Sequence, residues 1–409
     1  MAPCSLFGGQ RMRTLKKPLA RSWTRSSPVG RRPRIWVVML RSIFMNRACA
    51  FLIATQLGLA QVVVAADYSA VATHQPTGKT YRVEQQSNRV AASAQATQAC
   101  RAAHSQDPQS CALTELADTP VITAVDIKAR VSTDPHPLYL WRFEANGSTV
   151  YLAGSIHILK PGFYPLPRQF EHAFAQSDYL ALEVDTTQTS PSTMQALSLK
   201  YAQLPAATKL SSVLPATTYT QLANILREYG VDLQFFEQLK PNFVTQQLAV
   251  LALLSVGYEP ESGLESHFRR KRGSRPVLQL ETVEFQLDLL FDVALETQVQ
   301  MTEAMLTQMP NFESVTADLI TAWLAGDDAS FAAATEAQSG DTPELMAFSE
   351  ALIEARNHGM ADAVTGYLQR PGTYFVLIGS AHLIGDEGVP KLLEKAGYKS
   401  IRYQSNSSL

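Results

Sequence analysis

Two histidines in matching surroundings are the residues of this chain best suited to chemistry. Residues 150–157 read Val-Tyr-Leu-Ala-Gly-Ser-Ile-His, and residues 375–382 read Phe-Val-Leu-Ile-Gly-Ser-Ala-His. Each apolar run is typical of a buried strand, and the glycine at its end permits a sharp turn or a close approach of another group. If the two strands are neighbours in one sheet, His157 and His382 would reach one crevice at their carboxyl ends, where open α/β sheets bind ligands.

The repeated context is what favours a shared site. A single histidine at a strand end is more often structural, and a short motif by itself has a high false-positive rate. A structural role for both residues would leave the matched glycines unexplained. Neutral imidazoles bind Zn, Mn, Fe or Co, so a metal site formed by His157 and His382 is the first hypothesis.

Two glutamates end apolar segments of the same kind. A carboxylate in such a position is costly unless it is paired or bound to a metal. Glu183 and Glu281 are therefore candidates for ligands or for the general base of a hydrolytic metal site. N-caps, or salt bridges to Arg142 or Arg356, are the competing interpretation. Glu265 is a further candidate, and the absence of an HExxH motif excludes a standard zincin.

The remaining pattern indicates the elements that position these residues. Asn146-Gly147 lies between two apolar runs and predicts a hairpin. The predicted strands are 138–144, 148–153, 179–185, 275–281, 373–379 and 398–403, and the predicted helical regions are 165–174, 190–256, 282–368 and 387–396. We therefore expect an α/β (α+β) fold, with a central mixed sheet that carries both strand-end histidine motifs and encloses a large helical insertion.

The first 66 residues have the character of an export segment. They contain eleven Lys or Arg and no Asp or Glu, and residues 48–64 form an apolar stretch of signal-peptide length followed by Ala65-Ala66. We predict a basic extension over 1–44, with Met45 as the true start, and a Sec-type signal peptide over 45–66. The alternative is an uncleaved membrane anchor. The expected location is the periplasm or the exterior, with membrane contact only through this segment.

The charge balance makes nucleic acid an unexpected partner. The whole chain has 35 basic and 37 acidic residues, and without residues 1–66 the basic count falls to 24 while the acidic count stays at 37. A nucleic-acid-binding protein needs a clustered basic face. The one dense basic run left, residues 269–272, is interpreted as a solvated helix face.

Residues 67–136 are rich in Ala, Gln, Ser and Thr and poor in large apolar side chains. This composition predicts a flexible or loosely packed polar leader. Cys100 and Cys111 are the two cysteines left after the export segment, and in an exported protein they are expected to pair as a local disulfide.

These motifs resemble the TraB/GumN family, which includes the TIKI proteins, extracellular metal-dependent proteases. The resemblance covers residues 137–404 and rests on the order of several motifs. These are the hairpin with Trp141, Leu152–His157, Leu182-Glu183, Gly263-Leu-Glu265, Leu280–Gln286, Arg356-Asn357, and Leu377–Leu383 with Gly385.

The resemblance implies a chemistry and a set of site residues. Family members carry paired Gly-x-x-His motifs and a glutamate as proposed metal and catalytic residues. The corresponding metal set here is His157, His382, Glu183 and Glu265, and the corresponding catalytic set is Glu183, Glu281, Arg356 and Asn357. Gly263-Leu-Glu265 replaces the Gly-Ile-Asp that is common in the family, which keeps the charge on a longer side chain.

The hypothesis is therefore an exported hydrolase dependent on a divalent metal (Mn, Co or Zn), and more specifically a TIKI-like peptidase acting on a peptide or protein. The alternative is a non-enzymatic envelope protein that binds haem, a metal ion or a partner of a polysaccharide pathway, because histidine also ligates haem iron.

Overall fold

The computed structural model describes residues 67–336 and 342–408. The predicted extension and signal peptide lie outside the described residues. Within the described ranges, no helix has both the length and the apolar character needed to cross a bilayer.

In residues 67–336 and 342–408, ten strands form two sheets. The strands are β1 Tyr68–His74, β2 Lys79–Gln86, β3 Cys111–Leu116, β4 Thr119–Pro120, β5 Pro137–Ala145, β6 Ser148–Ser155, β7 Tyr179–Leu182, β8 Val277–Gln279, β9 Gly372–Gly379 and β10 Ser400–Gln404. The first four make a small sheet in the order β2-β1-β3-β4, and the other six make the central sheet.

Among the described residues, the first α-helix is labelled α2. They are α2 Arg89–Ala103, α3 Ala124–Ala129, α4 Arg168–Ala175, α5 Pro191–Ala202, α6 Leu210–Val213, α7 Ala216–Glu228, α8 Pro241–Ser255, α9 Leu264–Lys271, α10 Val283–Phe291, α11 Leu295–Gln308, α12 Phe312–Ala325, α13 Asp328–Glu336, α14 Pro343–Leu352, α15 Glu354–Leu368 and α16 Val389–Lys395.

The central sheet is mixed, as predicted. Its order is β10-β5-β6-β9-β7-β8, with antiparallel pairing of β10, β5 and β6 and parallel pairing from β6 through β9 and β7 to β8. The two strands that end in the histidine motifs, β6 and β9, are direct neighbours, and Ser155 is in register with Gly379. The carboxyl ends of four parallel strands therefore meet at one edge of this sheet.

Local sequence explains the hairpin at the start of this sheet. Asn146 and Gly147 have φ angles of 52° and 74°. Both values lie in the left-handed region that a two-residue type I′ turn requires. The predicted hairpin is thus confirmed, and it places β6 next to β5.

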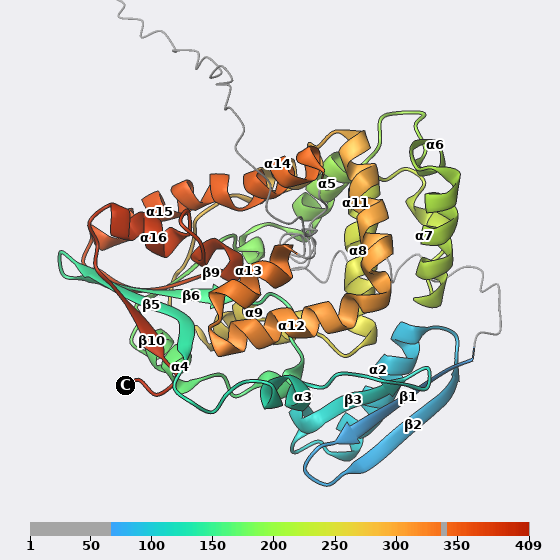
Figure 1. The fold of residues 1–409 in the computed structure, drawn as a ribbon, viewed down its shortest axis with the longest axis horizontal. Helices are drawn as coiled ribbons and strands as arrows, with labels where there is room; N and C mark the ends of the chain where they lie inside the picture. Colours follow the sequence, from blue (N-terminus) through green and yellow to red (C-terminus); the bar gives the residue numbers. More distant parts are fainter. Residues whose placement is uncertain (1–66, 337–341, 409) are drawn as a thin grey trace, which may run out of the picture. The chain divides into compact units, whose positions relative to one another are not determined.

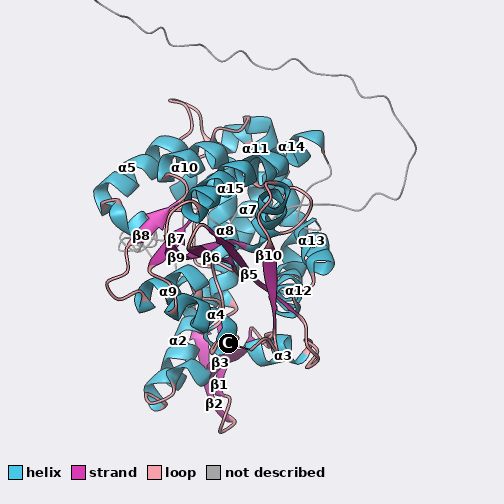
Figure 2. Ribbon diagram, turned by 90° about the vertical axis from the view of Figure 1, so that its left-hand side faces the viewer, coloured by secondary structure: helices cyan, strands magenta, loops and turns pink. Residues whose placement is uncertain are grey.

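Helices cover both faces of the central sheet (Figures 1 and 2). Helix α15 lies on one face, and α4 and α9 lie on the other. Where the structure describes it, the long connection from β7 to β9 contains α5 to α15 and one short strand, β8, so the predicted helical insertion is confirmed. Within it, α11 packs against α7 and α8.

One predicted helix begins later than expected. Proline was expected to start a helix at 165, but α4 begins at Arg168. Leu166 precedes Pro167, and a residue before proline is disfavoured in the helical region because its backbone clashes with the proline ring. The helix can therefore begin only after the second proline.

The prediction of a flexible leader over 67–136 is wrong. This segment forms the four-stranded sheet, helix α2 and helix α3, and we call it the N-terminal module. The contact between α2 and β1 is made by small side chains: Ala92, Ala96 and Cys100 on α2 are fully buried, as are Ala70 and Ala72 on β1. Alanine-rich faces allow a helix to approach a sheet closely, so few large apolar residues are needed.

The predicted disulfide is present in this module. Cys100 and Cys111 are bonded, with their Cα atoms 5.9 Å apart. Because Cys100 lies in the last turn of α2 and Cys111 begins β3, the bond ties the helix to the sheet on which it packs.

Lys160 joins the N-terminal module to the loop after β6. Its ammonium group donates to the Ile122 carbonyl and lies 3.9 Å from Glu313 Oε1. The side chain is 8% exposed, and burial lowers the pKa of Lys160 to about 8, although Glu313 and Asp126 oppose this shift.

This burial predicts an unusual pH dependence. Between about pH 8 and pH 10.5 the folded state loses the Lys160 proton while the unfolded state still holds it, so the free energy of unfolding should rise with pH. At pH 7, Lys160→Met should stabilise the fold by about 2 kcal/mol, the burial penalty less the lost hydrogen bond. Urea denaturation of both proteins from pH 7 to 10.5 measures this, and a rise of equal size in Lys160→Met would contradict it.

Candidate functional site

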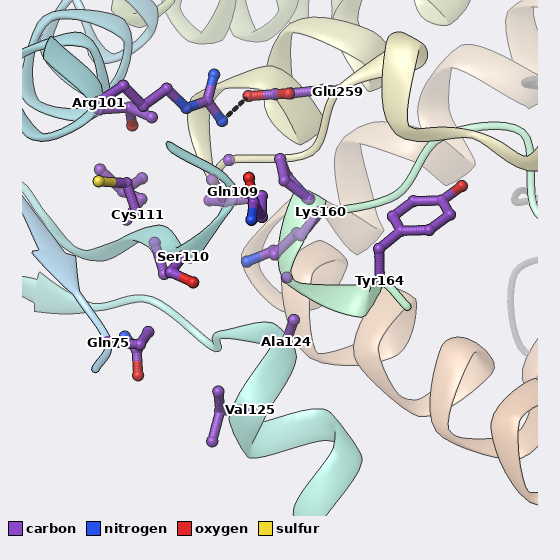
Figure 3. A pocket seen from close by; sticks show the side chains of 17 residues that line it. Gln75, Arg101, Gln109, Ser110, Cys111, Ala124, Val125, Lys160, Tyr164 and Glu259 are labelled. Carbon is purple, nitrogen blue, oxygen red and sulfur yellow. Dashed lines mark hydrogen bonds and ion pairs between the residues drawn. The ribbon is translucent and has the colours of Figure 1, made fainter. Parts of the chain in front are cut away.

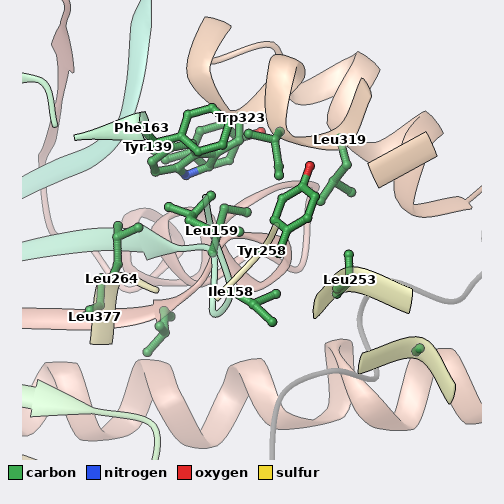
Figure 4. Packing of buried hydrophobic residues seen from close by; sticks show 14 of the residues in the cluster. Tyr139, Ile158, Leu159, Phe163, Leu253, Tyr258, Leu264, Leu319, Trp323 and Leu377 are labelled. Atoms are coloured by element: carbon green, nitrogen blue, oxygen red, sulfur yellow. The ribbon is translucent and has the colours of Figure 1, made fainter. Parts of the chain in front are cut away.

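His157 follows the end of β6 and is held by the core beneath its loop. Leu159 is fully buried, and Ile158 is 9% exposed. Figure 4 shows both among Tyr258, Leu264 and Trp323. The two apolar residues that follow His157 thus anchor the loop and leave the polar ring at the sheet edge, with 22% of its side chain exposed.

The loop of Glu265 packs directly on His157. Leu264 N donates to the Ile156 carbonyl at 3.2 Å. A Cβ atom on Gly263 would lie 2.0 Å from the His157 carbonyl oxygen, so only glycine permits this approach. The contact places Glu265 Oε1 2.7 Å from His157 Nδ1.

Ionisation of Glu265 is favoured in this position. Burial would raise its pKa, but the His157 ring beside the carboxylate holds the pKa below its usual value. The other ring nitrogen of His157, Nε2, is buried and has no hydrogen-bond partner among residues 67–336 and 342–408.

His382 lies at the end of β9 and is fully buried. Its Nδ1 is 2.6 Å from Asn357 Oδ1, and the Asn357 amide nitrogen donates to the Glu387 carbonyl at 2.7 Å. Since the amide nitrogen is used in this way, its oxygen accepts from His382 Nδ1. His382 Nε2 is 4.0 Å from Glu183 Oε1.

Both strand-end histidines therefore share one arrangement. In each case Nδ1 faces an oxygen acceptor, Glu265 for His157 and Asn357 for His382. In a neutral imidazole, a proton on Nδ1 puts the lone pair on Nε2. Histidines that bind metals are oriented in this way by an acceptor on the other ring nitrogen.

The two predicted strand-end glutamates converge on one arginine. Arg356 Nη2 is 2.8 Å from Glu183 Oε2 and 2.5 Å from Glu281 Oε2. Burial would lower the pKa of Arg356, but the two carboxylates raise it above its ordinary value. Of the salt bridges considered from the sequence, the one to Arg356 is present, while Arg142 pairs with Glu144 instead.

Further donors complete this network. Gly379 N donates to Glu183 Oε1 at 2.6 Å, which ties the carboxylate to the end of β9. Gln286 Nε2 is 2.9 Å from Glu281 Oε2 and 3.4 Å from Glu183 Oε2. Gln286 ends the Leu280–Gln286 motif, and the sequence predicted no role for it. Its place in the first turns of α10, just after Glu281, is the signal that could have identified it.

Arg269 also differs from expectation. It was grouped with residues 269–272 as a solvated helix face, but its side chain is only 17% exposed and its Nε lies 3.8 Å from Asp185 Oδ1. Arg270 and Lys271 on the same helix are less enclosed. In one turn of α9 the chain therefore places one arginine inward and its neighbours outward.

The charges at this end of the sheet do not balance. Four carboxylates, each at most 9% exposed, are accompanied by two guanidinium groups: Glu183, Asp185, Glu265 and Glu281 with Arg269 and Arg356. With both imidazoles neutral, the cluster has a net charge of −2. Buried charge of one sign is costly without compensation. Two protons on the histidines or one divalent cation would each restore the balance.

Among the four predicted metal ligands, the two histidines are the residues whose arrangement fits a metal ion. His157 has a buried, unpartnered Nε2, and His382 has the same Nδ1 arrangement. In the described part of the chain, no group of three or more His, Cys, Asp or Glu side chains is placed to hold a metal ion. Glu265 faces His157 Nδ1, and Glu183 faces Arg356, so neither carboxylate is arranged as a third ligand.

The fold and the site define a class: a mixed-sheet protein with two histidines at the ends of adjacent parallel strands, beside a buried cluster of carboxylates around an arginine. The model of the TraB/PrgY/gumN family matches residues 139–402, and the chain belongs to this family. The family assignment made from the motifs is confirmed, and the N-terminal module lies before the matched residues.

Two relatives extend the comparison. The chain is 23% identical over 248 residues to "Uncharacterized protein YbaP" of Escherichia coli (strain K12), which covers 59% of this chain and 87% of that protein. The protein of the same name from Shigella flexneri matches to the same extent. No solved structure matches.

Proposed function

We propose that this protein is an exported hydrolase whose site holds a divalent cation through Nε2 of His157 and His382, with a peptide or protein as substrate. The observation that carries the proposal is the shared orientation of the two rings, each with Nδ1 on an oxygen acceptor. Manganese, cobalt and zinc are the expected cations, because imidazole nitrogen suits them.

The net charge of the carboxylate cluster is the second support. The four carboxylates and two arginines of the cluster have a net charge of −2, and a divalent cation would compensate it. When bound, the cation would act as a Lewis acid and lower the pKa of water at the site.

The chain's own residues have separate roles in this proposal. Glu265 and Asn357 orient His157 and His382 through Nδ1. Glu183 is the proposed general base, because its Oε1 is the carboxylate oxygen near His382. Arg356 keeps Glu183 and Glu281 ionised by its positive charge. Access is from His157, whose side chain is partly exposed while His382 is buried.

Metal binding by the histidine variants tests the proposal. We expect His157→Ala and His382→Ala each to weaken Mn²⁺, Co²⁺ or Zn²⁺ binding at least 100-fold, and the double variant to lose stoichiometric metal. Glu265→Gln and Asn357→Leu should each weaken metal binding by about 10–100-fold. The first alters the acceptor at His157 Nδ1, and the second removes the acceptor at His382 Nδ1. Isothermal titration and elemental analysis of the purified protein give both values.

His358→Ala is the matched control, because His358 is an exposed histidine that pairs with Glu387 at the surface. It should bind metal as the unmodified protein does. If the double variant keeps stoichiometric metal, the proposed metal site is wrong. A peptide library hydrolysed only with added cation would support the enzyme, whereas a haemin absorbance shift that depends on His157 would favour the binding-protein alternative.

We also propose that the protein acts in the periplasm or outside the cell. The signal-like composition of residues 45–66 and the Cys100–Cys111 disulfide support this, because disulfides persist in oxidising compartments. N-terminal sequencing of the protein recovered from the exported fraction is expected to begin at Asp67. An intact segment 45–66 in that fraction would favour the membrane-anchor alternative.

A further inference from the structure

A pocket separates the N-terminal module from the loop after β6. Its volume is about 130 Å³. Its lining includes Arg101 and Ser110 from the module, and Lys160 and Glu259 from the residues that match the family model. Figure 3 shows Arg101 entering from α2 and Lys160 from the loop that follows His157. The pocket thus lies outside the cluster of site residues described above.

The charged groups of the pocket are predominantly basic. Arg101, Lys160 and Glu259 are the charged side chains of its lining, which leaves one positive charge in excess. Arg101 Nη2 is 2.5 Å from Glu259 Oε1, so these two charges compensate each other. Lys160 supplies the excess charge. This excess is notable in a chain whose residues after 66 carry 24 basic and 37 acidic side chains.

Lys160 has two carboxylates nearby, Glu313 and Asp126, but its ammonium group donates to the Ile122 carbonyl and to neither of them. Its side chain is 8% exposed, and the ammonium nitrogen lies 3.9 Å from Glu313 Oε1, beyond hydrogen-bond distance. Its ammonium group also lies 4.7 Å from the centre of the Tyr258 ring. A buried cation with these partners gains from a charge-assisted hydrogen bond to an added anion.

Neutral groups around Lys160 suit the rest of a small polar ligand. Gln75, Gln109 and Ser110 lie on the module side, and Val125 and Tyr164 supply apolar surface. Since a water molecule occupies roughly 30 Å³ of liquid, a space of this size suits a ligand of a few heavy atoms. One excess positive charge matches a monoanion better than a dianion.

We propose that this pocket binds a small organic monocarboxylate, with its carboxylate on Lys160 and its body between α3 and the segment 109–113. The site is independent of the proposed hydrolase activity, because it uses none of the residues of the histidine and carboxylate cluster.

Titration of the full purified protein with acetate, propionate and butyrate tests the proposal. We expect saturable binding of at least one of them, at least tenfold tighter than its amide, acetamide, propionamide or butyramide. Lys160→Met should weaken that binding at least tenfold. Lys128→Met is the matched control, because Lys128 contacts the same loop at the Gly162 carbonyl and is not in the pocket lining.

A second variant separates charge from folding. Val125 is 52% exposed and lines the pocket, so Val125→Trp narrows the pocket without changing a charged residue. It should also weaken carboxylate binding, while its thermal unfolding stays close to that of the unmodified protein. Equal binding of acid and amide, unchanged binding by Lys160→Met, or tighter binding of inorganic phosphate than of every carboxylate would each overturn the proposal.

Discussion

Replacing Arg356 by alanine is expected to lower the free energy of unfolding by about 3–5 kcal/mol. The guanidinium group is 2% exposed and bonds to both Glu183 and Glu281, whose side chains are 8% and 9% exposed. Its removal leaves two carboxylates together in a site that water reaches poorly. Urea denaturation at pH 7 measures the loss.

Two variants show whether this loss comes from uncompensated charge. Arg356→Met combined with Glu183→Gln and Glu281→Gln should recover most of the stability, because no charge of this trio then remains buried. Arg142→Ala is the exposed counterpart, since Arg142 and Glu144 are 35% and 52% exposed and such pairs contribute less than about 1 kcal/mol. An Arg356→Ala loss no greater than that of Arg142→Ala would show that the cluster does not depend on Arg356.

Gly263→Ala is expected to destabilise the protein by about 3 kcal/mol or more, at the upper end of overpacking substitutions. The new Cβ would lie 2.0 Å from the His157 carbonyl oxygen and 2.5 Å from its carbon. Both partners in this clash are backbone, so a side-chain rotation cannot relieve it. The loops of His157 and Glu265 must move apart.

This substitution should also affect the site. Because the 2.7 Å contact between His157 and Glu265 depends on the close approach of the two loops, metal binding should weaken together with stability. Gly359→Ala provides the control on α15, since its Cβ would meet none of the described atoms within 4 Å outside the neighbouring helix backbone. That change should be neutral or stabilising by up to about 1 kcal/mol. Equal stabilities for the two variants would contradict the packing argument.

Local pattern predicted the parts of the fold that depend on local physics. The Asn146-Gly147 turn requires two left-handed residues, and the β9 run is apolar because a central parallel strand is covered on both faces. The Gly-Ser ends of β6 and β9 were identified for the same reason. Their adjacency was an inference from the repeat, and the parallel register of Ser155 with Gly379 confirms it.

The amino-acid composition of residues 67–136 led to a wrong prediction, because the helix of this segment packs through small side chains. The N-terminal module has few large apolar residues, yet Ala92 and Ala96 let α2 pack closely on β1. The average hydrophobicity of a segment does not reveal a core that is built partly from alanine side chains. The inward position of Arg269 was missed for a related reason, because a run of basic residues contains no sign of which one faces a buried carboxylate.

By itself, the sequence determined the strands of the central sheet, the hairpin, the helical insertion, the disulfide and the set of polar residues at strand ends. Only the tertiary structure decided how those polar residues are partnered. It placed Arg356 between Glu183 and Glu281, Glu265 on His157 and Asn357 on His382. The physical reason is that a strand or turn depends on neighbours in the chain, whereas the partner of a buried charge depends on which distant segments the topology brings to the same sheet edge.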